Sequence, residues 1–196
     1  MDIHPNHRNI FLAYYSASQA EKDAGMAWYP QARALAETLR PDNVAMAAGV
    51  IAAMSQTTMW QDNVKRATAA LMDGDVRHLT HVVTKVHRIM AGEAPLDVLS
   101  GEKVRSFYLN IMGESDSLES VTVDRHAIDI AVGRVLSNAE RAKAIRGKAG
   151  YSKVAQMYID CANSLGTLTG AELQAIVWVW WRRTHAKNHR ANSKGV

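Results

Sequence analysis

Two ionisable side chains stand where helices are expected to begin. Lys103 lies in the first turn of an amphipathic segment that follows the turn Ser100-Gly101, and Asp124 directly precedes a second segment with apolar residues at helical spacing. A lysine amine is a nucleophile once deprotonated, which burial or a helix N-terminus favours. A carboxylate can take a proton from such a nucleophile or stabilise a nearby positive charge. The two residue types therefore suit one site in which an amine and a carboxylate act together.

Each residue also has a simpler interpretation. Asp124 is well placed to cap the helix that follows it, because its carboxylate can accept from the free N–H groups of the first turn. Lys103 can equally be a solvated first-turn residue. The two are 21 positions apart, so only the tertiary fold can bring them together. The residues alone leave both interpretations open.

The elements that must position these residues are helices. We expect an all-α fold of about nine helices and no sheet, since the β-branched run Val121 to Val123 is too short to seed one. Residues 44–54 are apolar on every side, which predicts a central, buried helix. Gly25 is expected to end the first helix, and residues 136–150 to form turns. The other expected helices cover residues 7–23, 28–39, 60–71, 76–91, 102–113, 125–135, 151–165 and 171–183, the last capped by Thr169 with Glu172, and a short helical piece is expected over 95–99.

Three short motifs together resemble the helix-hairpin-helix DNA glycosylase superfamily of the endonuclease III type. They are Ser55-Gln56-Thr57-Thr58, the turn Gly101-Glu102-Lys103, and Val123-Asp124-Arg125-His126, which occur in the family's order. The resemblance covers roughly residues 44–135. It implies a two-lobed helical bundle, with 44–135 as the central lobe and 1–43 plus 136–181 as the second lobe.

The resemblance also implies roles for individual residues. Lys103 would be the nucleophile and Asp124 the essential carboxylate. Gln56 would enter the space left in the duplex by an extruded base. The remaining implied DNA contacts are Ser55, Thr57, Gly101, Arg105, Arg125 and His126, and the residues implied to line the base pocket are Tyr108 and Asn110.

The activity implied is that of a DNA glycosylase that flips out a damaged or modified base and, through Lys103, cleaves the backbone at abasic sites. The chain departs from the family at Leu99, which replaces the first glycine of the hairpin. With one cysteine it also cannot build the iron–sulfur cluster that many members carry. Two alternatives stay open: a transferase like those of phage base hypermodification, acting on an activated hydroxymethyl pyrimidine, and a DNA-binding relative without catalysis.

Composition indicates the cellular compartment, the ligands and the partners that we expect. Cys161 is the single cysteine among 196 residues, which excludes an intramolecular disulfide and fits the reducing cytoplasm of a bacterial cell or phage-infected host. No apolar run approaches the roughly 18 residues of a spanning helix. His78 and His81 are three positions apart but lack further ligands nearby, so we expect no metal site. We expect a monomer that binds duplex DNA and needs no cofactor or membrane.

Positive charge gathers at the C-terminus. The net charge is +4, and residues 182–196 hold five of the 23 Lys and Arg residues and no acid, so the preceding part has 18 bases against 19 acids. A basic stretch of this kind suits contact with nucleic-acid phosphates. We expect residues 182–196 to form a disordered basic tail, which either binds phosphate or is simply solvated.

Overall fold

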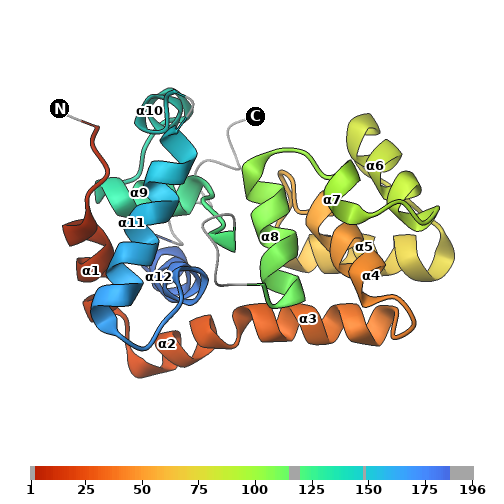
Figure 1. Cartoon of the computed structure of the whole chain (residues 1–196), viewed down its shortest axis with the longest axis horizontal. Helices are drawn as coiled ribbons and strands as arrows, with labels where there is room; N and C mark the ends of the chain where they lie inside the picture. Colours follow the sequence, from red (N-terminus) through yellow and green to blue (C-terminus); the bar gives the residue numbers. More distant parts are fainter. Residues whose placement is uncertain (1–2, 115–119, 148, 186–196) are drawn as a thin grey trace. The chain divides into compact units, whose positions relative to one another are not determined.

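The computed structural model describes residues 3–114, 120–147 and 149–185, and it confirms the all-α class, with no strand in those ranges. Figure 1 labels the helices α1 to α12. The chain divides into two compact units, each described by itself below. Unit 1 combines Met1–Trp28 with Ser115–Val196, and unit 2 is Tyr29–Glu114.

Unit 2 is built around one buried helix, α4. Its contacts are with α5, α6, α7 and α8, and every residue from Ala47 to Met54 is buried, as the uniformly apolar sequence predicts. Asn43 caps α4 by accepting from the backbone N–H of Met46 at 3.0 Å. The helices of this unit are α3 (Trp28–Leu39), α4 (Val44–Met54), α5 (Trp60–Asp73), α6 (Thr80–Met90), α7 (Pro95–Val98) and α8 (Glu102–Met112).

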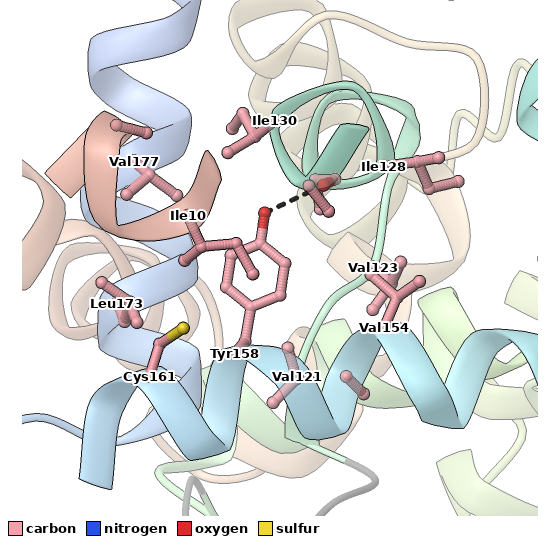
Figure 2. Close-up of a cluster of buried hydrophobic side chains, with 14 of the residues drawn as sticks. Ile10, Val121, Val123, Ile128, Ile130, Val154, Tyr158, Cys161, Leu173 and Val177 are labelled. Atoms are coloured by element: carbon pink, nitrogen blue, oxygen red, sulfur yellow. Dashed lines mark hydrogen bonds between the residues drawn. The ribbon is translucent and has the colours of Figure 1, made fainter. Parts of the chain in front are cut away.

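Unit 1 has its own core, centred on Tyr158. This side chain is fully buried among aliphatic residues from four helices, and its hydroxyl donates to the carbonyl oxygen of Ala127 at 2.9 Å (Figure 2). The bond ties α11 to α9 inside the core. The helices of this unit are α1 (His7–Ser16), α2 (Gln19–Met26), α9 (Arg125–Val132), α10 (Asn138–Ala144), α11 (Gly150–Leu165) and α12 (Gly170–Thr184).

Gly25 does not end a helix, contrary to the expectation from sequence. It lies inside α2 and is buried where α2 crosses α12. A Cβ atom at Gly25 would lie 2.4 Å from the Cα of Ile176, so the two helices approach this closely only because the side chain is absent.

The described residues form twelve helices instead of about nine, and the expected helix over 76–91 begins only at Thr80. Two further helix predictions are wrong, and capping explains both. The expected helix over 7–23 is two helices, because Ser18 and Glu21 form a capping box that starts α2. The expected turns over 136–150 contain α10, which Ser137 and Glu140 start in the same way. Arg182 and Arg183 are expected both in the last helix and in the basic tail, and they belong to α12, which ends at Thr184. Residues 186–196 lie outside the described residues.

The unit boundaries differ from the lobe boundaries given by the resemblance. The division falls at Trp28 and Glu114 instead of residues 43 and 135. Packing explains the difference for the Asp124 segment: α9 contacts α1, α10 and α12, all of which belong to unit 1. Helix α3 is mostly in unit 2, where Arg33 donates to the carbonyl oxygen of Met112.

Candidate functional site

The carboxylate of Asp124 is held by three N–H donors. Its Oδ1 accepts from the backbone N–H groups of His126 and Ala127, both at 2.9 Å, so the expected helix cap is confirmed. Its Oδ2 accepts from the indole Nε1 of Trp178 at 3.2 Å. Asp124 is nevertheless only half-buried. The carboxylate therefore has a fixed orientation while it stays open to a partner.

The segment that leads into Asp124 is fixed by Tyr151 of α11. The Tyr151 hydroxyl accepts from the backbone N–H of Val123 and donates to the carbonyl oxygen of Val121, each at 2.9 Å. A tyrosine hydroxyl can do both at once. The extended run Val121 to Val123 is thus anchored by a side chain instead of by a neighbouring strand.

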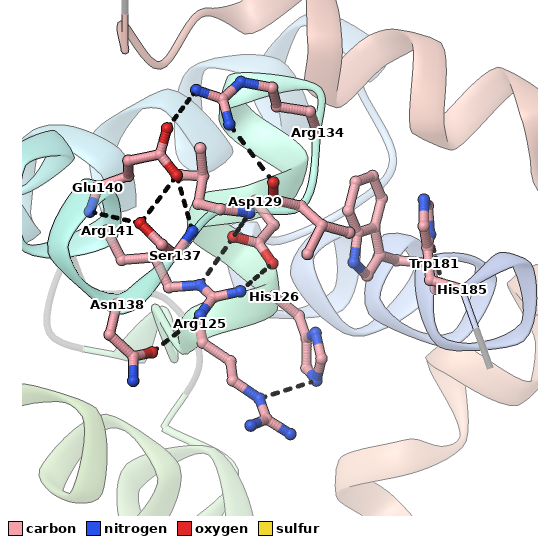
Figure 3. A network of polar contacts seen from close by, with 12 residues as sticks. Arg125, His126, Asp129, Arg134, Ser137, Asn138, Glu140, Arg141, Trp181 and His185 are labelled. Carbon is pink, nitrogen blue, oxygen red and sulfur yellow. Dashed lines mark hydrogen bonds and ion pairs between the residues drawn. The ribbon is translucent and has the colours of Figure 1, made fainter. Parts of the chain in front are cut away.

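Aromatic and basic side chains surround the Asp124 carboxylate. Trp178 packs against Trp28 with ring centroids 4.7 Å apart, and the guanidinium of Arg182 lies 4.7 Å from the Trp178 ring centroid. The His126 ring meets Trp178 edge-on at 6.5 Å. The Nε of Arg125 donates to Nε2 of His126 at 3.4 Å (Figure 3).

Asp129 is a second carboxylate on α9, but its partners give it a structural role. It is 1% exposed and accepts from Arg141 Nε and a second Arg141 nitrogen, at 2.8 and 2.7 Å (Figure 3). The backbone N–H of Leu136 adds a bond at 3.2 Å. Burial raises the pKa of Asp129, while the Arg141 guanidinium opposes that shift. This network docks α10 on α9, the helix that Asp124 caps.

The hairpin of unit 2 is the short helix, turn and helix that the sequence predicts. Gly101 is exposed and has φ of +87°, a conformation that L side chains rarely adopt. The N-cap residue Gly101 makes no side-chain hydrogen bond to the start of α8, which leaves this helix N-terminus suited to an anion, although the Val104 N–H already donates to the Gly101 carbonyl oxygen at 3.1 Å. Arg105 donates to the carbonyl oxygens of Leu96 and Leu99, which ties α8 to the turn. Lys103 is half-buried in the first turn of α8.

The Gln56 loop at the end of α4 has an ordered internal network. The hydroxyls of Thr57 and Thr58 donate to the carbonyl oxygen of Gln56 at 2.7 and 2.9 Å. Nδ1 of His78 accepts from the backbone N–H of Leu79 at 2.8 Å, so Nε2 carries the proton and donates to Thr58 Oγ1 at 3.0 Å. Thr57 has φ of +54°, an uncommon conformation for a non-glycine residue and one found at functional loops.

Burial lowers the pKa of His78, and the nearby Arg66 guanidinium and His81 add to this shift. A neutral His78 agrees with its role as the acceptor of the Leu79 N–H. His78 is therefore part of the support of the loop.

One face of α6 links this loop to the hairpin turn. Nε2 of His81 donates to Oε1 of Gln56 at 3.4 Å, and Nζ of Lys85 donates to Oγ of Ser100 at 2.6 Å. His81 and Lys85 are four residues apart, so they lie one above the other, about one helical turn apart. The Gln56 loop and the Ser100-Gly101 turn are thus neighbours on the same side of unit 2.

The structure also describes the three remaining residues that the resemblance implies, Ser55, Tyr108 and Asn110. Ser55 donates its hydroxyl to the carbonyl oxygen of Ala52 at 2.8 Å. Tyr108 and Asn110 are 7% and 3% exposed on α8, and burial raises the pKa of Tyr108. Their role in lining a base pocket stays a prediction.

Lys103 belongs to unit 2 and Asp124 to unit 1, so their meeting at one nucleotide also stays a prediction. Sequence reasoning missed four residues of these neighbourhoods: Trp178, Arg182, His81 and Lys85. The sequence did carry a signal for them: Trp178 and Arg182 are four positions apart on one expected helix, and His81 and Lys85 are four apart on another. Residues with this spacing share a helix face.

The described residues contain no group of three or more His, Cys, Asp or Glu side chains that could hold a metal ion. Within the same ranges, no helix has both the length and the apolar composition needed to cross a bilayer.

The fold and these two neighbourhoods define an all-α protein of two helical units. The chain belongs to DUF7178, a family of unknown function, which it matches over residues 2–185. Neither the curated proteins nor the solved structures include a match to it.

Proposed function

We propose that this protein is a DNA-binding enzyme of the helix-hairpin-helix glycosylase type, which extrudes a damaged or modified base from duplex DNA and acts on its nucleotide. In this proposal unit 2 supplies the DNA-contacting loops and the amine of Lys103. Unit 1 supplies the carboxylate of Asp124.

The observation that carries the proposal is the adjacency of the two loops on α6. A protein that extrudes a base must hold the strand beside the gap and also fill the gap. The open N-terminus of α8 at Gly101 suits a phosphate, and the Gln56 amide suits the vacated space. Because His81 and Lys85 join these loops within about one helical turn, both functions can be met on one stretch of DNA.

The setting of Asp124 suits the carboxylate that this chemistry needs. Breaking the bond between sugar C1′ and the base nitrogen develops positive charge on the sugar, which a nearby fixed carboxylate stabilises. The three N–H donors hold the Asp124 oxygens, so little reorganisation is needed when that charge forms.

Lys103 supplies the second step of the proposal. Its neutral amine attacks C1′, the base leaves with the electrons of the C1′–N bond, and Asp124 takes a proton from the attacking nitrogen. Ring opening gives a Schiff base, from which elimination breaks the C3′–O bond of the strand. The half-buried position at the start of α8 suits a lysine with this role.

The test is a product analysis on duplex oligonucleotides that carry single modified bases or an abasic site. Products are identified by mass spectrometry, and covalent intermediates are trapped with borohydride. The variants are Lys103→Ala and Asp124→Asn. Their matched controls are Lys65→Ala and Asp73→Asn, two exposed residues of α5.

The expected result is base release and a trapped adduct that Lys103→Ala abolishes and Lys65→Ala retains. Asp124→Asn should slow base release strongly, whereas Asp73→Asn should not. A base that gains mass with its C1′–N bond intact would identify a transferase instead. Binding without any product, unchanged by Asp124→Asn, would identify a non-catalytic DNA-binding protein.

A further inference from the structure

Arg182 lies near the end of α12, where it is half-buried and its guanidinium stacks on the Trp178 ring. Burial lowers the pKa of Arg182, and the Arg125 guanidinium adds to this while Asp124 opposes it. Arg125, Arg182 and Asp124 therefore share one electrostatic neighbourhood.

The charge of this neighbourhood is not balanced. Elsewhere in unit 1, carboxylates pair with Arg134, Arg141 and Arg183 at 2.6 to 2.7 Å. Among the described residues, no such ion pair is found for Arg125 or Arg182. The oxygens of Asp124 are engaged by N–H groups instead.

Arg182 is a half-buried cation without a described carboxylate in hydrogen-bond contact, which is unfavourable, and binding an anion lowers that cost. Arg125 is exposed, so it is open to the same anion. The chemistry of the two arginines suits an oxyanion, and the DNA strand of the proposed function supplies that oxyanion as phosphate. A guanidinium presents a planar set of donors that matches two phosphate oxygens, and stacking on an indole holds that plane in place. Asp124 and Arg182 both contact the Trp178 indole, one at its N–H and one at its ring face. An anion bound by Arg182 therefore lies close to Asp124.

We propose that Arg125 and Arg182 bind a backbone phosphate of the DNA strand, next to the nucleotide whose sugar faces Asp124. This inference rests on the proposed function and adds the contact that holds the strand on unit 1. It also gives Trp178 two tasks, since its ring supports Arg182 and its N–H orients Asp124.

The test pairs charge removal on the protein with charge removal on the DNA. The DNA is a duplex with a tetrahydrofuran abasic analogue, in which one phosphate at a time is replaced by a neutral methylphosphonate. The protein is the full chain as wild type, Arg182→Gln, Arg125→Gln, or the control Arg8→Gln, an exposed arginine of α1. Dissociation constants are measured at several salt concentrations, and circular dichroism verifies the folding of each variant.

We expect Arg182→Gln to weaken binding about tenfold and to lower the salt dependence by about one phosphate contact, whereas Arg8→Gln changes little. At one methylphosphonate position the wild type should lose affinity by a similar factor, and Arg182→Gln should lose nothing further. Arg125→Gln should behave in the same way at that position. Arg182→Lys, which keeps the charge but not the planar donors, should be intermediate.

The inference is overturned if the losses from Arg182→Gln and from methylphosphonate multiply at every position, or if Arg182→Gln equals Arg8→Gln. In both cases a wild-type preference for the tetrahydrofuran duplex leaves the proposed function standing. If the wild type does not prefer that duplex to an unmodified one, the proposed function and this inference fail together.

Discussion

Replacing Arg141 by methionine would leave the Asp129 carboxylate without its main partner. Asp129 is 1% exposed and would keep only the Leu136 N–H, at 3.2 Å, as a described donor. Removing one member of a buried ion pair costs roughly 3–5 kcal/mol of unfolding free energy. Since the Arg141 side chain is 16% exposed and water can reach it, we expect about 3 kcal/mol.

The pH dependence of this loss has a definite sign. Burial already raises the pKa of Asp129, and removal of Arg141 raises that pKa further. A carboxyl whose folded-state pKa is raised binds its proton more tightly when folded, so the penalty grows as pH rises above the unfolded value of about 3.9. Arg141→Met should therefore lose less stability at pH 5 than at pH 7.

The assay is urea unfolding followed by tryptophan fluorescence, at both pH values. Four of the five tryptophans belong to unit 1, so the signal reports mainly on that unit. The control is Arg134→Met, because Arg134 pairs with Glu140 at a more exposed site, so its loss should cost much less stability than the loss of Arg141. The double variant Asp129→Asn, Arg141→Met should recover part of the loss. Equal losses for Arg141→Met and Arg134→Met, or a larger loss at pH 5 than at pH 7, would refute this reasoning.

Four further predictions concern single residues. Trp178→Phe removes the donor to Asp124 Oδ2 and keeps a ring, so base release should slow roughly fivefold to tenfold while the affinity for the tetrahydrofuran duplex is unchanged; an unchanged rate would contradict the positioning role. Gly25→Ala places a Cβ against the Ile176 backbone and should cost about 2 kcal/mol in thermal unfolding, whereas an unchanged Tm would contradict the close packing. Burial raises the pKa of Cys161 to about 11, with a smaller contribution from Asp160, so the native thiol should resist a disulfide reagent that reacts on unfolding; rapid labelling of the native chain would be the contrary result. Because the pKa of His78 is lowered on folding, the unfolded chain takes up its proton first, and unit 2 should lose stability as pH falls below about 6.5. Amide hydrogen exchange of the unit 2 helices should show a smaller loss in His78→Gln, and an equal loss would count against the neutral histidine.

Local patterns predicted most of the fold. The uniformly apolar run of α4 and the capping box at Thr169 gave helices that the structure confirms. The same capping-box pattern at Ser18 and at Ser137 would have predicted the starts of α2 and α10. The two wrong helix predictions therefore arose because these capping boxes were not taken into account.

Other features depend on contacts between distant residues, which no local pattern reveals. Gly25 suggests a helix end by residue type, but its backbone neighbour is Ile176, about 150 positions away. The assignment of α9 to unit 1 depends in the same way on packing against α1 and α12. The spacing of residues along the chain cannot show that α2 packs against α12, or that α9 packs in unit 1.

The candidate site shows the same limit. The type of Arg105 suits a phosphate contact, yet its guanidinium is bonded to hairpin carbonyl oxygens, so we assign it to the support of the turn. The capping role of Asp124 was readable from its position, whereas its bond to Trp178 joins residues 54 positions apart. The i, i+4 spacing of Trp178 and Arg182 could have grouped that pair, but not with Asp124.

The central claim is that Lys103 and Asp124 act on one extruded nucleotide. The most direct measurement is a crystal structure of the full chain, trapped by borohydride on an abasic duplex or bound to the tetrahydrofuran analogue. The account predicts an extruded sugar with the Lys103 Nζ and an Asp124 oxygen each within about 3.5 Å of C1′, or Nζ covalently joined to C1′ in the trapped form. A complex in which either side chain lies away from the sugar, or in which the DNA keeps every base stacked, would contradict it.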